Sequence, residues 1–398
     1  MFIKTYYVLL TIKKNLMEEK DDKYRLDGVN IELGDDFSSF CGRVCKSTYK
    51  HSGFVEVLDL ARGNFRGPRG FILKNLPDGC IQTMVADGIG TKVVPIVASG
   101  KLETAASNVI AMTAMDITRY GGLPLVFVNI FDVNSLGEPG SETYQLCVDT
   151  MIGLKRLAGT YGYVVLGGET AELGACVGSE NIDAKVKFNW GGVMLGVYHP
   201  NKMIYGDTLK PGQVIMALQD DFRSNGISSV RKAFALQYGP DWYNNPEALP
   251  DIIAAASPSA QYDRFLNFLN GWGNVVKNYE PIINAHLIVH LSGGAFESKL
   301  GKDMLEPQGL SAELDNLFSP PDIMKKCASW RGLSDEECYR TWNGGQGALV
   351  VIDKKDVNNF LCWAECFGVE AKIAGKIVKK QDYLVKLKSK FSDKIIIY

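Results

Sequence analysis

The chain has little of what zinc sites and disulfide scaffolds require. Its 398 residues include four histidines and nine cysteines, and no two cysteines form a C-x-x-C pair. Cys41 and Cys45, like Cys362 and Cys366, are four residues apart, which places both thiols on one face of a helix. An odd cysteine count without metal-ligand spacing argues against a zinc site, and we expect reduced thiols in a cytoplasmic protein.

Long apolar runs and an excess of charge of one sign are also missing. No run is long enough to span a bilayer, so we expect no membrane partner. A formal net charge of −2 gives no reason to expect a nucleic-acid partner. Lysines interrupt the apolar opening of residues 1–16, which argues against a secretory signal, and Met17 is a hypothetical alternative start.

Neither a P-loop nor a dinucleotide-binding fingerprint occurs. Two other glycine-rich motifs follow short apolar runs: Asp87-Gly-Ile-Gly-Thr-Lys92 after residues 81–86, and Gly167-Gly-Glu-Thr-Ala-Glu172 after residues 163–166. Such runs predict buried strands, and α/β proteins bind ligands at strand ends. Carboxylates suit Mg²⁺, and lysine and exposed backbone N–H groups suit phosphate. Alone, the first motif is more typical of a turn; together, the two predict a nucleotide site.

Hydrophobic patterning predicts the elements that carry these motifs. Residues 26–60 indicate only short amphipathic stretches. The nearly continuous apolar run 123–131 predicts a strand in a sheet that is covered on both faces. Asp207 to Gly212 predicts a domain boundary. The other expected strands are 71–73, 81–86, 164–166, 193–198, 214–218, 287–291, 349–352, 372–378, 383–387 and 394–397. The expected helices are 103–118, one from an N-cap at Ser141 to Gly159, one after Gly226, and those near 260–279 and 355–366.

Six segments follow one another in an order that single short motifs rarely produce by accident. They are Asp87 to Lys92; Asp116 with Gly121-Gly-Leu-Pro124; Gly167 to Glu172; Ser224-Asn-Gly226 with Val230-Arg-Lys232; His290-Leu-Ser-Gly-Gly294; and Tyr339-Arg-Thr-Trp-Asn-Gly-Gly-Gln-Gly347. Their order and spacing resemble the aminoimidazole ribonucleotide synthetases, also called phosphoribosylformylglycinamidine cyclo-ligases. The resemblance runs from about Leu26 to the C-terminus, and the extra length resembles the longer bacterial form.

The resemblance implies a two-domain fold of the α/β (α+β) class, that of the cyclo-ligase-like ATP-binding superfamily. After an N-terminal extension of residues 1–25, it implies an ATP-binding and dimerisation domain over 26–206, which forms a barrel across a homodimer. An α/β substrate-binding domain over 207–398 follows. The implied reaction is ATP-dependent closure of the imidazole ring of formylglycinamidine ribonucleotide in purine biosynthesis. The implied cofactors are ATP and Mg²⁺, with K⁺ as a further candidate.

Carried over by position, the resemblance also implies site residues. The implied catalytic residues are Lys92 and His290. The implied ligands of Mg²⁺ are Asp87, Asp116 and Glu169. The implied ATP contacts are Asp87, Gly88, Gly90, Thr91, Lys92, Asp116, Gly167, Gly168 and Glu169. The implied substrate contacts are Ser224, Asn225, Gly226, Ser292, Gly293, Gly294 and Asn343.

Each of these assignments has a structural alternative. Asp116 is equally typical of a solvent-facing charge at a helix end, and Glu169 of a helix cap. Ser224 is typical of an ordinary N-cap, and Asn343 of a tight turn. His290 would be a core histidine without the resemblance; with it, substrate binding or proton transfer is favoured.

The chain also departs from the family pattern. Arg223 stands where many members have a histidine, so a general acid–base role cannot be carried over to that position. Met115 replaces the usual asparagine before Asp116, and Asn189 stands where aspartate is common. Trp342 and Gly344 differ from the residues that are usual in the last motif. Arg223 and Met115 are the changes that we expect to affect rate or substrate fit most.

Two rival functions share part of this pattern. A small-molecule kinase of the same superfamily would use a similar first motif, but it leaves His290 to Gly294 and Asn343 to Gly347 unexplained. A catalytically silent nucleotide-binding scaffold would account for Met115 and Arg223, but it has no need for the charges of Asp87, Lys92 and Glu169. Turnover of the ring-closing substrate separates these hypotheses.

Overall fold

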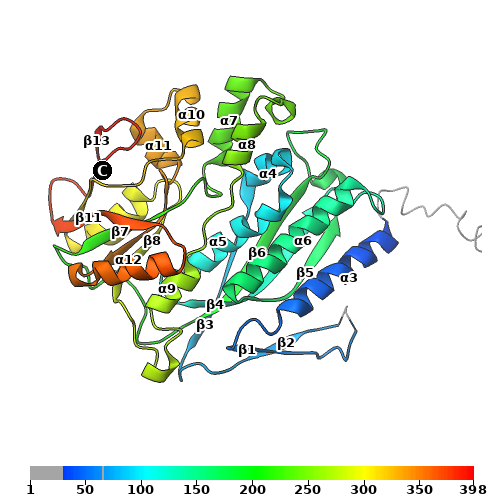
Figure 1. The fold of residues 1–398 in the computed structure, drawn as a ribbon, viewed down its shortest axis with the longest axis horizontal. Coiled ribbons are helices and arrows are strands. Elements are labelled where there is room, and N and C mark those ends of the chain that lie inside the picture. The colour runs from blue at the N-terminus through cyan, green and yellow to red at the C-terminus, as the bar shows by residue number, and fades with distance from the viewer. Residues whose placement is uncertain (1–29, 65–66) are drawn as a thin grey trace, which may run out of the picture.

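The computed structural model describes residues 30–64 and 67–398 (Figure 1). The expected extension over 1–25 and the hypothetical start at Met17 lie outside these residues. The first described helix, α3 (Ile31–Thr48), has 18 residues, so the prediction of only short stretches across 26–60 is wrong. Asn30 begins it by accepting a hydrogen bond from the Leu33 backbone N–H at 3.1 Å, and Leu33 and Phe37 are buried on its inner face.

A four-stranded sheet carries both glycine-rich motifs. Its strand order is β3-β6-β4-β5, in which β4 and β5 are parallel and the other pairs are antiparallel. The strands are β3 (Ile81–Gly88), β4 (Leu123–Val133), β5 (Val164–Glu172) and β6 (Phe188–Tyr198). A separate antiparallel pair joins β1 (Val55–Leu58) to β2 (Gly70–Leu73). Because β5 runs through Glu172, the second motif lies wholly within its strand. The first motif begins in β3, which ends at Gly88, and continues beyond it into a short 3-10 helix, Gly90–Lys92.

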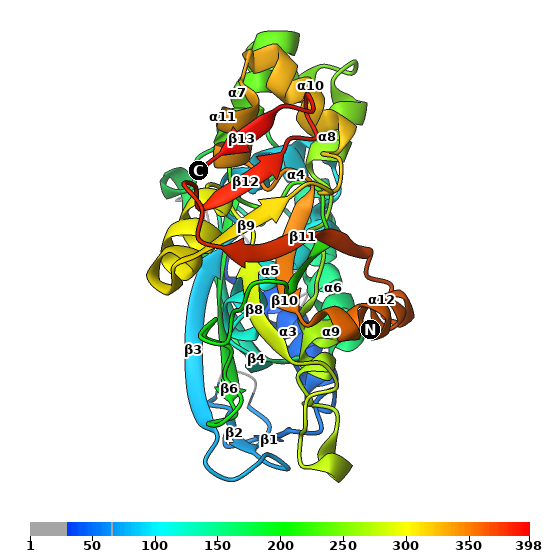
Figure 2. The ribbon, with the colours of Figure 1, turned by 90° about the vertical axis from the view of Figure 1, so that its left-hand side faces the viewer.

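Helices cover one face of this sheet. On the opposite, open face, Val126 and Val197 are buried in a cluster with Val55 of β1, and only the remaining part is exposed among the described residues. Phe127, Phe131 and Trp190 are buried in the core beneath α3, α5 (Ala105–Thr118) and α6 (Glu142–Tyr161). Figures 1 and 2 show these three helices on the same side of the sheet. On the opposite face, the side chain of Met84 is 70% exposed and that of Ile130 is 56% exposed. Among the described residues the second face is therefore covered only in part, short of the cover on both faces that the apolar run 123–131 predicted; antiparallel pairs do not need a helix on each side.

The second sheet has seven strands in the order β13-β12-β9-β11-β7-β10-β8. Alternate residues of its central strands enter two different cores: Ile215 and Val351 lie on one face, and Met216 and Val350 on the other. The strands are β7 (Val214–Gln219), β8 (Ala285–His290), β9 (Leu310–Leu314), β10 (Gln346–Ile352), β11 (Ala371–Lys379), β12 (Val385–Lys388) and β13 (Ile395–Ile397). The expected boundary at Asp207 to Gly212 lies between β6 and β7, and so between the two sheets.

Helices cover the second sheet and extend beyond it. Alongside them, α4 (Val93–Ser99) of the first half brings Val94 into a separate apolar cluster with Phe222 and Trp342. The helices of the second half are α7 (Ile227–Tyr238), α8 (Leu249–Ala255), α9 (Asp263–Leu269), α10 (Asp322–Arg331), α11 (Asp335–Thr341) and α12 (Val357–Cys366), together with a π-helix (Phe296–Leu305).

Two helix ends differ from the prediction. Helix α6 begins at the Ser141 cap as expected, but it continues through Gly159 to Tyr161, because the left-handed position that ends it is Gly162, with φ of 81°. The predicted helix over 260–279 is only α9, which ends at Leu269. Gly271 has φ of 92°, and a Cβ there would lie 2.1 Å from the Tyr279 carbonyl oxygen, so the chain turns back at this glycine.

Helix α5 lies between the two halves of the molecule. All of its residues except Asp116 are buried, which explains why its sequence is apolar on nearly every side. Polar bonds from the second half reach this helix: Ser259 donates to the Asn108 side chain at 2.8 Å, and Gln261 donates to the Ser107 carbonyl at 2.6 Å. The two sheets are thereby held in a defined orientation around α5.

Candidate active site

Strand register places the two glycine-rich motifs in one row across the first sheet. Asp87 of β3 pairs with Gly192 of β6, which pairs with Asn129 of β4, which in turn pairs with Gly168 of β5. At about 4.8 Å per strand, Asp87 and Gly168 are separated by roughly 14 Å. Side chains alternate between faces, so Asp87 projects toward α5. Glu169, one residue beyond Gly168, pairs with Ile130 and projects to the open face.

Asp87 faces a second carboxylate from helix α5. Its own Oδ1 accepts a hydrogen bond from the Gly88 N–H at 2.7 Å. Burial raises the pKa of Asp87, the Gly88 bond lowers it, and the nearby Asp116 carboxylate raises it further. Asp116 is the one residue of α5 that is not buried. The two carboxylates therefore interact electrostatically near the edge of α5 that faces the second half of the chain.

His290, from the end of β8, reaches the same place. Its Nδ1 lies 3.8 Å from the Asp116 Oδ1, and its side chain is only 1% exposed. Burial lowers the pKa of His290, and the Arg223 guanidinium lowers it further, so the imidazole is neutral. Burial alone would raise the pKa of Asp116, but His290 and Arg119 together lower it, so Asp116 is ionised. Within the described residues, the buried His290 Nε2 has no hydrogen-bond partner.

The segment Ser224-Asn225-Gly226 adjoins the first glycine-rich motif. It precedes α7, and Gly226 caps this helix with φ of 75°. The Thr91 Oγ1 lies 3.4 Å from the Oγ of Ser228 in the first turn of α7. Ser224 Oγ and Asn225 Oδ1 are buried and find no hydrogen-bond partner in the described part of the chain. Buried polar atoms without partners are typical of sites that a ligand completes.

The last two motifs shape the walls around these groups. Asn343 is buried and donates from Nδ2 to the Asp221 carbonyl at 2.8 Å, so it supports the loop before Ser224. A Cβ on Gly226 would lie 2.4 Å from the Thr341 carbonyl oxygen, and one on Gly293 would lie 3.0 Å from the same atom. Only glycine fits at Gly226. The approach of Thr341 to Gly226 and Gly293 joins the fourth, fifth and sixth motifs. The His290–Asp116 and Thr91–Ser228 contacts connect them to the second and first motifs.

Lys92 has a different environment from the one that its motif suggested. Its side chain is fully buried, and its ammonium donates to the Ser257 carbonyl at 2.7 Å and to the Phe222 carbonyl. Burial lowers the pKa of Lys92 to about 7, although Asp220 opposes this shift. The structure thus places this lysine between the two halves of the chain, bonded to backbone oxygens, and a role on phosphate stays a prediction.

Arg223 is also buried at this junction. Its Nη1 contacts the Asp220 Oδ2 at 2.5 Å, with the two side chains 1% and 2% exposed. Its Nη2 donates to the Ala111 carbonyl of α5 at 3.3 Å, and its Nη1 to the Ala260 carbonyl at 3.4 Å. The residue that departs from the family pattern therefore connects the second half of the chain to α5.

The structure does not bring Glu169 into this cluster. No group of three or more histidine, cysteine, aspartate or glutamate side chains that could hold a metal ion occurs among residues 30–64 and 67–398. Instead, Gly167, Gly168 and Glu169 line a cavity of about 560 Å³ beneath α3, together with Lys46 and Arg69. Glu169 lies within β5 and is not a helix cap, so that alternative is wrong. Its role as a ligand of Mg²⁺ stays a prediction.

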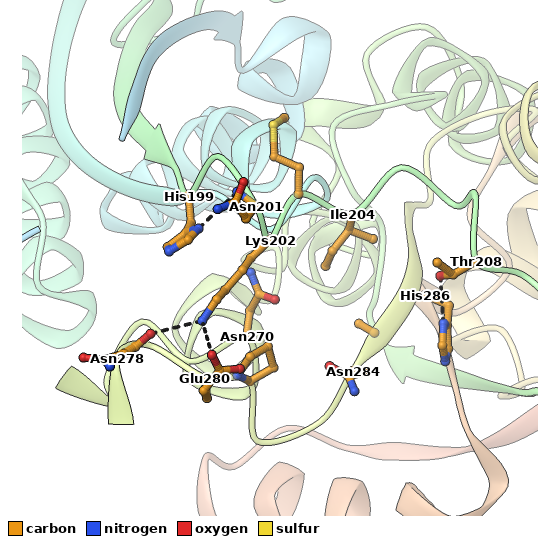
Figure 3. Close-up of a pocket in the computed structure, with 13 residues that line it drawn as sticks. His199, Asn201, Lys202, Ile204, Thr208, Asn270, Asn278, Glu280, Asn284 and His286 are labelled. Carbon is orange, nitrogen blue, oxygen red and sulfur yellow. Dashed lines mark hydrogen bonds and ion pairs between the residues drawn. The ribbon is translucent and has the colours of Figure 1, made fainter. Parts of the chain in front are cut away.

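A further cavity, of about 690 Å³, lies apart from all six motifs (Figure 3). Its lysine, Lys202, is engaged with Glu280 at 3.2 Å and with the Tyr279 carbonyl at 2.8 Å. His286, at its other end, contacts Thr208 at 2.8 Å and Asp353 at 3.1 Å. Because its charged groups already have partners, we place the candidate active site at the junction of Asp87, Asp116, His290 and the Ser224 segment.

Sequence reasoning missed four cations near these residues. Arg119 lies three residues after Asp116, a helical spacing that could have indicated it, and the Arg119 Nε is 3.5 Å from the Asp116 Oδ1. Lys299 is brought to the junction by the π-helix; it follows Gly294 of the fifth motif by five residues but belongs to no motif, so the sequence carried no such signal. Lys46 and Arg69 share the cavity under α3 only because of the way that this helix lies on the sheet.

The chain is similar in sequence to one protein family and to several curated enzymes. Residues 72–196 match the family model "AIR synthase related protein, N-terminal domain". The phosphoribosylformylglycinamidine cyclo-ligase of Magnetococcus marinus is 25% identical over 361 residues, which cover 89% of this chain and 92% of that protein. The Staphylococcus aureus enzyme (strain Newman) is 26% identical over 377 residues, covering 92% and 98%. The chain is thus similar to curated cyclo-ligases along nearly its whole length.

Solved structures show the same fold at low sequence identity. Thiamine-monophosphate kinase from Stenotrophomonas maltophilia aligns with a TM-score of 0.54 at 14% identity, covering 88% of this chain and 96% of the kinase. Hydrogenase maturation protein HypE, in complex with ATP, aligns with a TM-score of 0.53 at 14% identity, covering 81% and 85%. These likenesses confirm the expected two-part α/β fold. The cyclo-ligase relatives extend along nearly the whole chain, so both halves of the candidate site lie within the shared region.

Proposed function

We propose that this chain catalyses the ATP-dependent closure of formylglycinamidine ribonucleotide to aminoimidazole ribonucleotide, a ligase reaction of purine biosynthesis. The observation that carries the proposal is the similarity to curated cyclo-ligases over about nine-tenths of both chains. In this reaction the amide-type oxygen takes the γ-phosphoryl group of ATP, a nitrogen of the same substrate attacks the activated carbon, and phosphate leaves. The related kinase fold supports the architecture alone, so a small-molecule kinase is not favoured.

The geometry suits this chemistry because it depends on positioning and charge rather than on a protein nucleophile. Asp87 and Asp116 converge from two elements, as suits Mg²⁺, which commonly takes one or two carboxylates along with nucleotide phosphates. We propose that they hold an ion that arrives with ATP; when bound, it would offset the negative charge of the phosphates. Glu169 projects to the other face of the sheet and would act at a distance from this pair.

His290 and the Ser224 segment would hold the substrate. Because the pKa of His290 is lowered by burial, its neutral imidazole is a weak base, and we propose that its unpaired Nε2 orients the substrate rather than removes a proton. Ser224 Oγ and Asn225 Oδ1 are free to bond a polar ligand next to the N-terminus of α7, where an anion is stabilised. Holding both reacting ends of one substrate together can lower the activation barrier by roughly 7–11 kcal/mol.

A turnover assay tests the proposal. Purified protein with ATP, Mg²⁺ and formylglycinamidine ribonucleotide should release ADP, phosphate and aminoimidazole ribonucleotide in equal amounts. Omission of the ribonucleotide is the matched control for simple ATP hydrolysis. ATP binding without ring closure would instead support the catalytically silent scaffold, and transfer of phosphate to a stable product would support a kinase. Replacing Na⁺ with K⁺ in the same assay tests the monovalent-ion candidate.

We also propose a homodimer that forms through the open face of the first sheet. Apolar side chains of three neighbouring strands occupy this face: Met84 of β3, Leu195 and Val193 of β6, and Val128 and Ile130 of β4. A contiguous apolar face of this kind is typical of an interaction surface. Light scattering on the purified protein should give twice the chain mass of 43.8 kDa.

A cytoplasmic location and a small-molecule substrate complete the proposal. All nine cysteines, which lie within the described residues, are free thiols. Free thiols are usual in a reducing compartment. No helix in the described part of the chain has the length and apolar character needed to cross a membrane.

A further inference from the structure

Lys299 lies at the candidate active site but belongs to none of the six motifs. It stands on the π-helix Phe296–Leu305, which begins just after Gly294. Its ammonium donates to the Ser292 Oγ at 2.8 Å and to the His290 carbonyl at 3.4 Å. An ammonium has three N–H donors, so one remains without an acceptor among the described residues.

The charges around Lys299 come from both halves of the chain. Burial lowers the pKa of Lys299, and Arg119 and Arg223 lower it further, whereas Asp116 raises it. Asp220 already pairs with Arg223, so that guanidinium is largely neutralised. Arg119 is not paired in the same way: its buried Nε has no hydrogen-bond partner in the described residues, and its 3.5 Å contact with Asp116 is an ion pair only.

Arg119 and Lys299 repel one another through space, and an anion bound near both would relieve this repulsion. Arg119 ends α5 in the first half of the chain, and Lys299 comes from the second half. Each has an N–H without an acceptor, and each lies near the Asp116 carboxylate, where we place the metal ion. Lysine binds phosphate as a compact point charge, and arginine binds it through a planar set of N–H donors.

We propose that Lys299, with Arg119, binds a phosphoryl group of the bound ligands across the junction of the two halves. The inference rests on the function proposed above and adds a phosphate-binding pair to that site. The phosphoryl group belongs either to ATP or to the ribonucleotide, since both bring the same oxygen chemistry. Because one cation stands on each half, the phosphoryl group would also hold the two halves together when the ligand is bound.

Direct binding measurements test this proposal and distinguish the two sources. Calorimetric titrations with a non-hydrolysable ATP analogue plus Mg²⁺, and separately with the ribonucleotide, would compare wild type, Lys299→Met and Lys302→Met. Lys302 is the matched control because it lies on the same π-helix, is exposed and pairs with Glu297 at 2.8 Å. We expect Lys299→Met to weaken one of the two ligands by about tenfold or more, as the loss of a charged hydrogen bond requires. Lys302→Met should stay within about twofold of wild type.

The ligand that loses affinity identifies the source of the phosphoryl group. Lys299→Arg should recover most of that affinity, since it keeps the charge, whereas a purely structural lysine would not show a ligand-specific loss. Unchanged affinity of Lys299→Met for both ligands would overturn the proposal, and so would a wild-type protein that binds neither. If Lys299→Met does not fold, Lys299→Gln, which can still donate to Ser292, replaces it. Failure of wild-type ring closure with phosphate-dependent binding intact would refute the proposed function but not this pair.

Discussion

Replacing Arg223 by methionine should destabilise the protein far more than the loss of a surface charge would. The Arg223→Met change leaves the Asp220 carboxylate 2% exposed and without its cation, although its Oδ1 still accepts the N–H groups of Asp221 and Ala260 at 2.9 and 3.0 Å. Breaking a buried pair on one side costs about 3–5 kcal/mol. The Ala111 and Ala260 carbonyls also lose a donor, but at 3.3 and 3.4 Å these bonds are long and add little.

A double variant separates the cost of the unpaired Asp220 charge from the cost of the lost arginine contacts. Arg223→Met combined with Asp220→Asn removes both charges, and replacing a buried ion pair with neutral groups is often close to neutral in stability. We therefore expect the double variant to recover at least about 2 kcal/mol relative to Arg223→Met in urea unfolding, read as a coupling energy. Equal destabilisation of the single and double variants would refute the reasoning, as would a single-variant effect below about 1 kcal/mol.

The loss of stability in Arg223→Met should depend on pH. Burial already raises the pKa of Asp220, with Arg223 and Lys92 opposing the shift. Removing Arg223 raises it further, so the folded variant holds a proton that the unfolded chain releases at lower pH. Stability is then lost as the pH rises from the unfolded to the folded pKa. The deficit of Arg223→Met should be larger at pH 8 than at pH 5, and a deficit independent of pH would contradict this account.

Three further predictions follow from other parts of the structure. Burial raises the pKa of Asp263 to about 6, so the stability of the fold falls as the pH rises from about 4 to 6. Asp263→Asn should remove this loss of up to about 3 kcal/mol in urea unfolding. Asp322→Asn, at an exposed carboxylate, should keep the wild-type dependence on pH. Asp116→Asn should lower kcat about a hundredfold without a change in thermal midpoint, and activity near that of wild type would remove Asp116 from the site. Met84→Lys should yield a monomer by light scattering, and a retained dimer would place the interface elsewhere.

The elements that hold the site could be predicted from local patterns. The apolar runs before Asp87 and before Ser292, and the Ser141 cap, are features that neighbouring residues decide, and the strands and the helix start at these places are confirmed. Helix α5 was predicted as well, because its alanine-rich sequence favours a helix in any context. Two of the predictions that failed, the end of α6 and the helix over 260–279, are places where a glycine in left-handed geometry or a distant carbonyl decides the path.

The environments of the charged residues could not be predicted in the same way. Lys92 sits in a motif that is typical of phosphate binding, yet its donors go to carbonyls of Phe222 and Ser257, more than a hundred residues away. Asp87 and Glu169 occur in equivalent motifs, but strand alternation turns them to opposite faces. Lys299 carries no local signal at all. Burial and pairing depend on which segments meet in space, and a short motif does not contain that information.

The sequence by itself determined the likeness to the cyclo-ligases, the order of the six motifs and most of the strands, because hydrophobic periodicity and glycine placement act over a few residues. Only the tertiary structure decided which charges share the junction. Asp116, His290 and Arg223 come together there because α5 lies between the two sheets, and burial in that layer sets their protonation and their partners. Charge and desolvation act through space, so their effect on each group could be assigned only once the chain was folded.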